Sequence, residues 1–156
     1  MIVVVRAFVV TAAPEVVVDY LRDFGHTAEW DPSTRRTTRI GAGPIGVGTS
    51  WHNVSRVLGL TTELTYSLVV DERDRIVFIG RNEAATSTDT ITVRPVESGT
   101  EVTYHVDVEV HGVAKLATPV MKIEFAKLGD EIAVRLTEVL DALPRFLSDP
   151  GSKMEA

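Results

Sequence analysis

The chain has 156 residues, a length that suits one domain with a sizeable core. It contains no cysteine, which excludes disulfides and thiolate zinc sites. Its 16 basic and 22 acidic residues give a net charge of −6. Nucleic acid and anionic membranes are therefore disfavoured as main partners, because both require a concentrated basic face.

The first predicted element is a strand over residues 2–10, which is rich in valine, a residue that fits a pleated surface. Arg6 interrupts this apolar run and no charged leader precedes it, so it does not resemble a signal peptide. No stretch of the chain approaches the ~18 consecutive apolar residues of a membrane span. We therefore expect a soluble, cytoplasmic protein.

A helix is predicted to begin at Pro14, because proline suits the first helical position, where its missing N–H leaves no bond unmade. Val17, Leu21 and Phe24 recur at helical spacing and form an apolar stripe. A second short helical turn over residues 26–30 is expected to end before Pro32.

Residues 35–110 change to a period of two, which is typical of strands with one apolar and one polar face. The clearest segment covers residues 101–110, where valines and Tyr104 alternate with charged or polar residues. Turn signals at residues 71–74 and 98–99 separate neighbouring segments. This pattern predicts an antiparallel meander with one wet and one dry side.

The last predicted element is a long amphipathic helix between Gly112 and Pro144, with Pro119 near its start. Its apolar stripe is predicted to cover the dry side of the sheet. The stripe consists of Leu116, Val120, Ile123, Leu128, Ile132, Leu136, Val139 and Leu143. Residues 1–146 thus form one predicted domain, and residues 147–156 a predicted disordered tail.

A G-x-G-x-x-G pattern occurs at Gly41, Gly43 and Gly46. A dinucleotide site would need a buried parallel strand before this pattern and a helix directly after it. Both flanking segments are instead alternating and strand-like, and Pro44 removes one N–H from any phosphate cradle. The glycines are therefore predicted to form a hairpin loop.

The order of these elements resembles the helix-grip fold, and local residues agree with it. The residues that carry a resemblance to the START-like (SRPBCC) superfamily, over residues 2–143, are Pro14, Trp30, Pro32, Gly46, Gly48, Gly99 and Thr100. The branch most similar is the bacterial polyketide cyclase/dehydrase-like group. This resemblance implies an α+β fold, in which a curved antiparallel sheet of about seven strands wraps around a long C-terminal helix.

Members of that superfamily enclose a cavity between sheet and helix for lipids, sterols, polyketides or other apolar molecules. Many only bind, some are aromatases or cyclases, and some act as co-chaperones. The resemblance therefore implies binding of a hydrophobic small molecule, with a polyketide cyclase/dehydratase-type enzyme as the alternative. A third possibility is a protein-interaction module with a filled interior and an exposed apolar patch.

The residues predicted to line such a cavity are Trp30, Trp51, Asn53, Tyr66, Asp89, Tyr104, Val106, Val120 and Phe125. Some of them have an alternative interpretation. Trp51 could belong to the plain core with Asn53 near a strand end, and Trp30 could be a packing plug instead of a gate.

Asp89 and Tyr104 are the only candidates for catalysis. Asp89 shares the phase of Ile91 and Val93, and inside an apolar cavity its pKa would rise, which would allow it to act as a general acid or base. Alternatively, it lies at a polar strand end and bonds to nearby hydroxyls. With one such carboxylate and no inward-facing histidine, ligand binding is the leading hypothesis.

No cofactor is predicted. No histidine pair has the spacing of a metal motif, and the chain lacks a G-x-S-x-G nucleophile elbow. The expected partner is a hydrophobic small molecule, and the sequence leaves the oligomeric state open.

Overall fold

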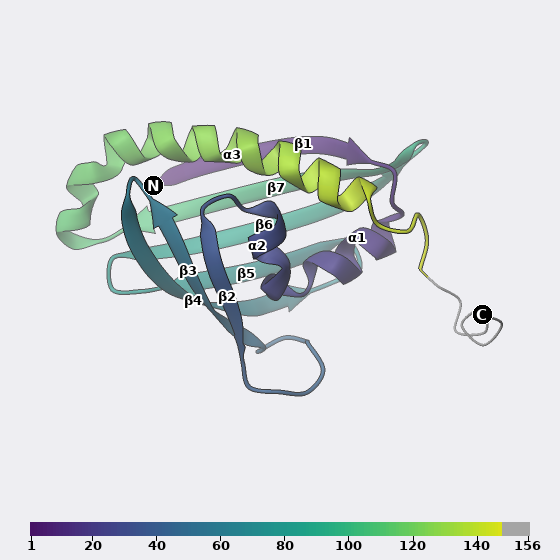
Figure 1. Ribbon diagram of the computed structural model, residues 1–156, viewed down its shortest axis with the longest axis horizontal. Coiled ribbons are helices and arrows are strands. Elements are labelled where there is room, and N and C mark those ends of the chain that lie inside the picture. Colours follow the sequence, from purple (N-terminus) through teal and green to yellow (C-terminus); the bar gives the residue numbers. More distant parts are fainter. Residues whose placement is uncertain (148–156) are drawn as a thin grey trace.

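The computed structural model describes residues 1–147 and consists of one sheet, a long helix and several short helices (Figure 1). The strands are β1 (Ile2–Val10), β2 (Thr34–Ile40), β3 (Ser50–Val57), β4 (Leu60–Asp71), β5 (Arg75–Arg81), β6 (Ala85–Val96) and β7 (Gly99–Val110). The helices are α1 (Pro14–Leu21), η1 (Phe24–His26), α2 (Thr27–Trp30), η2 (Gly112–Ala117) and α3 (Thr118–Asp141). The predicted tail, apart from Leu147, lies outside the described residues.

The seven strands form one antiparallel sheet in the order β1-β7-β6-β5-β4-β3-β2. Each pair of adjacent strands in the sheet, except β1 and β7, is also consecutive in the chain. This order confirms the predicted meander. The sheet curves around α3, so that in Figure 1 its edge strand β1 runs behind the helix, whereas β2 and β3, at the opposite edge, lie in front of β5 and β6. This is the α+β helix-grip architecture that the element order predicts.

The glycine-rich segment joins β2 to β3, two antiparallel neighbours, and forms the predicted hairpin loop. Gly41, Gly43 and Gly48 have φ values of 86°, 96° and 96°, a region that favours glycine because it has no Cβ. Gly48 N–H donates to the Leu68 carbonyl, which ties the loop to β4. No helix follows the loop, so it does not form a dinucleotide site.

The α3 helix is locked onto β1 at one point near its middle. Gly129 lets the two elements approach closely, since a Cβ there would lie 2.5 Å from Cγ1 of Val4. Beside it, Arg6 Nε donates to Asp130 Oδ1 at 2.8 Å, and Arg6 Nη2 donates to the Ala126 carbonyl at 2.9 Å. The close approach at Gly129 and the bonds of Arg6 together hold α3 against β1.

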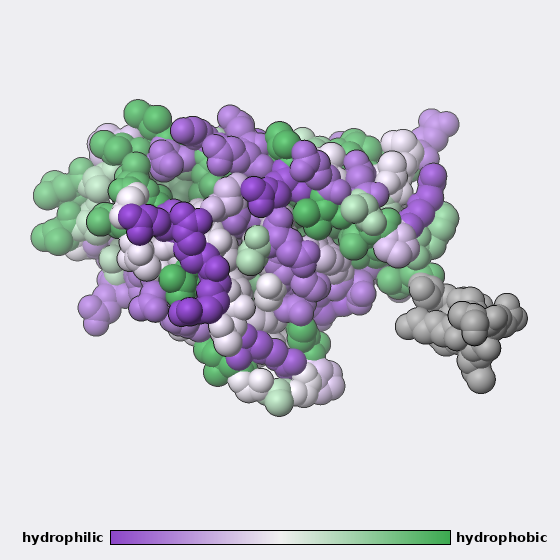
Figure 2. All heavy atoms as spheres, viewed as in Figure 1, coloured by the Kyte–Doolittle hydropathy of each residue, from purple (hydrophilic) through white to green (hydrophobic). Residues whose placement is uncertain are grey.

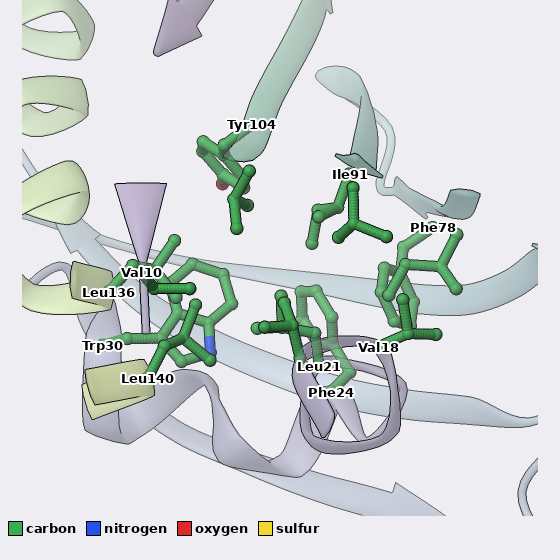
Figure 3. Close-up of a cluster of buried hydrophobic side chains, with 14 of the residues drawn as sticks. Val10, Val18, Leu21, Phe24, Trp30, Phe78, Ile91, Tyr104, Leu136 and Leu140 are labelled. Carbon is green, nitrogen blue, oxygen red and sulfur yellow. The ribbon is translucent and has the colours of Figure 1, made fainter. Parts of the chain in front are cut away.

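The C-terminal half of α3 covers a packed core, into which Ile132, Leu136 and Leu140 are fully inserted. Figure 3 shows Leu136 and Leu140 beside Trp30 and Val10. In the same view Val18, Leu21 and Phe24, from α1 and η1, lie near Phe78 of β5 and Ile91 of β6. This half of the interior is solid.

The N-terminal part of the predicted apolar stripe does not face the sheet, which corrects that prediction. Leu116, Val120 and Ile123 are 86%, 56% and 75% exposed. The inward face here carries Met121 and Phe125 instead, and Ile123 lies roughly 200° around the helix from Met121 at 3.6 residues per turn. Apolar residues lie on both faces of this segment, so their spacing alone did not identify the inner one.

Candidate functional site

A cavity of about 440 Å³ lies between the N-terminal half of α3 and the concave face of the sheet. This volume is within the ~300–1,000 Å³ that is usual for sites of small molecules. Side chains from β1, β3, β4, β6, β7, η2 and α3 line it, together with residues of η1, α2 and the segment before β2. The cavity therefore begins where the solid core ends.

Seven of the nine residues that the sequence predicts for the cavity are in its lining. They are Trp30, Asn53, Tyr66, Asp89, Tyr104, Val106 and Phe125. Most of the remaining lining is aliphatic, with Val108, Val110, Leu128 and Ile132 among its members. A guest in this space would contact mainly carbon, with a few polar groups at fixed positions.

Trp51 is one of the two exceptions, and its predicted role as a cavity wall is corrected. Its side chain is fully buried in the packed core, where its ring contacts Phe78 edge-on at a centroid distance of 5.7 Å. Phe24 lies 6.1 Å away on another side of the indole and itself lines the cavity. Trp51 thus supports the cavity wall from behind.

Val120 is the second exception. It lies on α3 but points to solvent and does not belong to the lining. The neighbouring Met121 takes the inward position that was predicted for Val120.

Asp89 is the buried carboxylate of the cavity, with 5% of its surface exposed. Ser87 Oγ donates to its Oδ1 at 2.8 Å, and the Tyr104 hydroxyl donates to its Oδ2 at 3.4 Å. Burial raises the pKa of Asp89 to about 7, against the hydrogen bond from Ser87, which lowers it. The Asp31 carboxylate raises it further, so Asp89 can hold or release a proton near neutral pH.

Asp31 is a second carboxylate in the lining, and it was not predicted from the sequence. Its Oδ1 accepts bonds from the Ser33 N–H at 2.9 Å and from the Ser33 hydroxyl at 2.7 Å, and its Oδ2 accepts from the Thr34 hydroxyl at 3.1 Å. Burial raises the pKa of Asp31, and these bonds oppose the rise. Asp-Pro-Ser resembles a turn in sequence, so the only available signal pointed to a loop.

Two tyrosines complete this polar region, and burial raises the pKa of both well above the usual range. Tyr104 contacts the Trp30 ring edge-on at 5.7 Å, and Tyr66 stacks on Phe24 at 4.3 Å. The Tyr66 ring lies flat against β5 because Gly80 has no side chain; a Cβ there would come within 2.6 Å of the ring. Gly80 thus makes room for this part of the wall.

Asn53 lines the cavity, but its amide is already bonded within the protein. Nδ2 donates to Thr37 Oγ1 at 2.9 Å, and Oδ1 accepts from Ser55 Oγ at 2.6 Å. Thr37 Oγ1 in turn lies 2.6 Å from the hydroxyl of Thr27 on α2. The amide therefore links β3 through β2 to α2, which explains an asparagine inside a strand.

Exposed apolar side chains surround the end of the cavity formed by η2. Val113 and Leu116 of η2 and Leu60 of β4 are 88%, 86% and 68% exposed. Figure 2 shows hydrophobic residues gathered at the end of the molecule where η2 and the start of α3 lie. The same segments line the cavity through Ala114 and Ala117, so this patch adjoins its interior.

Within residues 1–147, no three His, Asp or Glu side chains are placed to hold a metal ion. No helix in this part of the chain is both long and apolar enough to cross a bilayer.

A curved sheet, a gripping helix and a cavity between them define a helix-grip protein with an internal apolar chamber. The chain belongs to the family described as polyketide cyclase / dehydrase and lipid transport, which it matches over residues 1–141. This match confirms the resemblance inferred from the sequence. No curated protein is significantly similar to the chain.

Solved structures share this fold at low sequence identity. A START superfamily protein from Mycobacterium smegmatis is 15% identical, with a TM-score of 0.74 over 91% of this chain and 99% of that one. The Zhui aromatase/cyclase from a Streptomyces species is 12% identical, with a TM-score of 0.68 over 88% and 90%. The di-domain ARO/CYC protein BexL is 15% identical, with a TM-score of 0.69 over 91% and 50%. At these identities the likeness shows the fold alone.

Proposed function

We propose that this protein binds a hydrophobic small molecule in the cavity between α3 and the sheet. The observation that carries the proposal is the cavity itself, about 440 Å³ in volume and lined mainly by aliphatic and aromatic side chains. Burial of a ligand's apolar surface there would contribute roughly 25 cal/mol per Å², before the costs of association. The family and its structural neighbours support a ligand-binding fold of this kind.

Filling the cavity should abolish binding without unfolding the protein. Val106 on β7 lines the chamber and pairs across the sheet with Asp89, so Val106→Trp would place an indole in the space of the guest. Native mass spectrometry of freshly purified protein should show an apolar molecule bound to the wild type and none bound to this variant.

The matched control is Val3→Trp, which adds the same side chain to the outer face of the same sheet, at a residue 54% exposed. This variant should retain the bound molecule. Equal occupancy in the wild type and Val106→Trp would contradict the proposed site.

The geometry of Asp89 supports a second function, a polyketide cyclase/dehydratase-type enzyme that acts in the same cavity. In an aldol cyclisation, the Asp89 carboxylate would take a proton from an activated carbon, which then bonds to a carbonyl carbon. The Tyr104 hydroxyl, 3.4 Å from Asp89, would give its proton to the oxygen of that carbonyl. Turnover of a poly-β-ketone by the wild type, and its loss in Asp89→Asn, would favour this function over binding alone.

A further inference from the structure

The charged groups in the cavity lining are all of one sign. Asp31 and Asp89 belong to the lining, and among the described residues that form it there is no lysine, arginine or histidine. No ion pair within residues 1–147 involves either carboxylate. The cavity therefore holds acidic groups without a cationic partner, which is an unusual content for a buried apolar space.

This charge pattern disfavours an anionic guest. A carboxylate or phosphate placed in the cavity would lose its hydration and meet no cation there. It would also be repelled by Asp31 and Asp89 across a medium of low dielectric constant.

Asp89, in contrast, can accept more hydrogen bonds than the protein supplies. A carboxylate has about four acceptor positions, and here one oxygen accepts from Ser87 and the other from Tyr104, at the long distance of 3.4 Å. Asp31 already accepts three bonds, from Ser33 and Thr34. The acceptor open to a guest is thus Asp89.

Aromatic rings surround the same end of the cavity. Tyr104 contacts Asp89 and packs against Trp30 in a T-shaped arrangement, and Tyr66 stacks on Phe24. All four rings line the chamber. Phe24 and Gly80 cover the two faces of the Tyr66 ring, so the rings whose negative faces can attract a desolvated cation are those of Trp30 and Tyr104.

We propose that the ligand is an apolar amine, whose ammonium group donates to the Asp89 carboxylate while its hydrocarbon part fills the chamber under α3. This inference rests on the proposed ligand-binding function and specifies the chemical class of the guest. The carboxylate without a cationic partner, the lack of basic lining residues and the rings of Trp30 and Tyr104 all favour this class.

A matched set of probes tests the class directly. Naphthylethylamine, naphthylethanol and naphthylacetate share one apolar body and differ in the charge of the head group. In calorimetric titrations at about pH 8, where an alkylamine is protonated, the amine should bind most tightly and the alcohol about tenfold more weakly. The acetate should show no measurable binding.

Two isosteric variants complete the test. Asp89→Asn should remove the advantage of the amine, so that amine and alcohol bind alike, whereas Asp107→Asn, on a partly exposed part of β7, should leave the order unchanged. Binding of the alcohol or acetate as tightly as the amine would overturn the amine inference but leave ligand binding intact. Binding of none of the three would overturn both.

Discussion

Replacing Leu136 with alanine is expected to lower the free energy of unfolding by about 2–5 kcal/mol. Leu136 is fully buried in α3, where Figure 3 shows it beside Trp30 and Val10 in the solid half of the interior. Its truncation would leave a void that the neighbouring rings and the sheet cannot close. Urea denaturation followed by circular dichroism measures this loss.

The control for this prediction is Val134→Ala on the same helix. Val134 is 62% exposed, so its truncation should change the stability by less than about 0.5 kcal/mol. Similar losses for both variants would mean that the C-terminal half of α3 is not seated on the core as described.

Asp89→Asn is expected to change how stability depends on pH. Burial raises the pKa of Asp89 to about 7 in the folded protein, whereas an unfolded aspartate titrates near ~3.9. Between these values the folded state holds a proton that the unfolded state releases, so rising pH favours unfolding. The variant lacks this group, and its stability relative to the wild type should therefore rise by on the order of 4 kcal/mol between about pH 4 and pH 8.

The measurement is urea denaturation of both proteins across this pH range. The groups that face Asp89, namely Asp31, Tyr66, Tyr104 and Ser87, are the same in both and largely cancel in the difference. The control is Asp74→Asn, at an exposed carboxylate in the turn between β4 and β5. The difference in stability between this variant and the wild type should change little across the pH range. A difference between wild type and Asp89→Asn that is constant with pH would contradict the buried, proton-holding carboxyl.

The sheet could be predicted from sequence because alternation reports burial directly. In β7 the inward positions are valines and Tyr104, and in β6 Asp89 lies inside with Ile91 and Val93, as their shared phase implies. The helix at Pro14 likewise begins where the missing N–H of proline requires. Both signals depend only on residues close together in the sequence, so they could be recognised without knowledge of the fold.

The separation of cavity from solid core could not be predicted. Trp51 and Asn53 share one face of β3, yet Trp51 lies in the core and Asn53 at the cavity. The difference depends on where Phe24 and Phe78, from distant parts of the chain, fill the space. The alternation of residues along a strand shows which face of the sheet points inward, but not whether side chains or an empty cavity lie opposite that face.

Asp31, the second carboxylate of the cavity wall, was missed for a related reason. Asp31 belongs to a turn, and the bonds that it accepts from Ser33 and Thr34 are those of any turn. Only the fold brings this turn to the cavity that Asp89 of β6 also lines.

Diffraction from a xenon-pressurised crystal of protein freed of bound ligand by refolding tests the existence of the apolar chamber most directly, because xenon enters empty apolar cavities in proteins. Xenon density is expected under the N-terminal half of α3, within reach of Val106, Val108 and Phe125. Side chains of α3 in direct contact with β6 and β7, with no xenon between them, would contradict a site for a guest there.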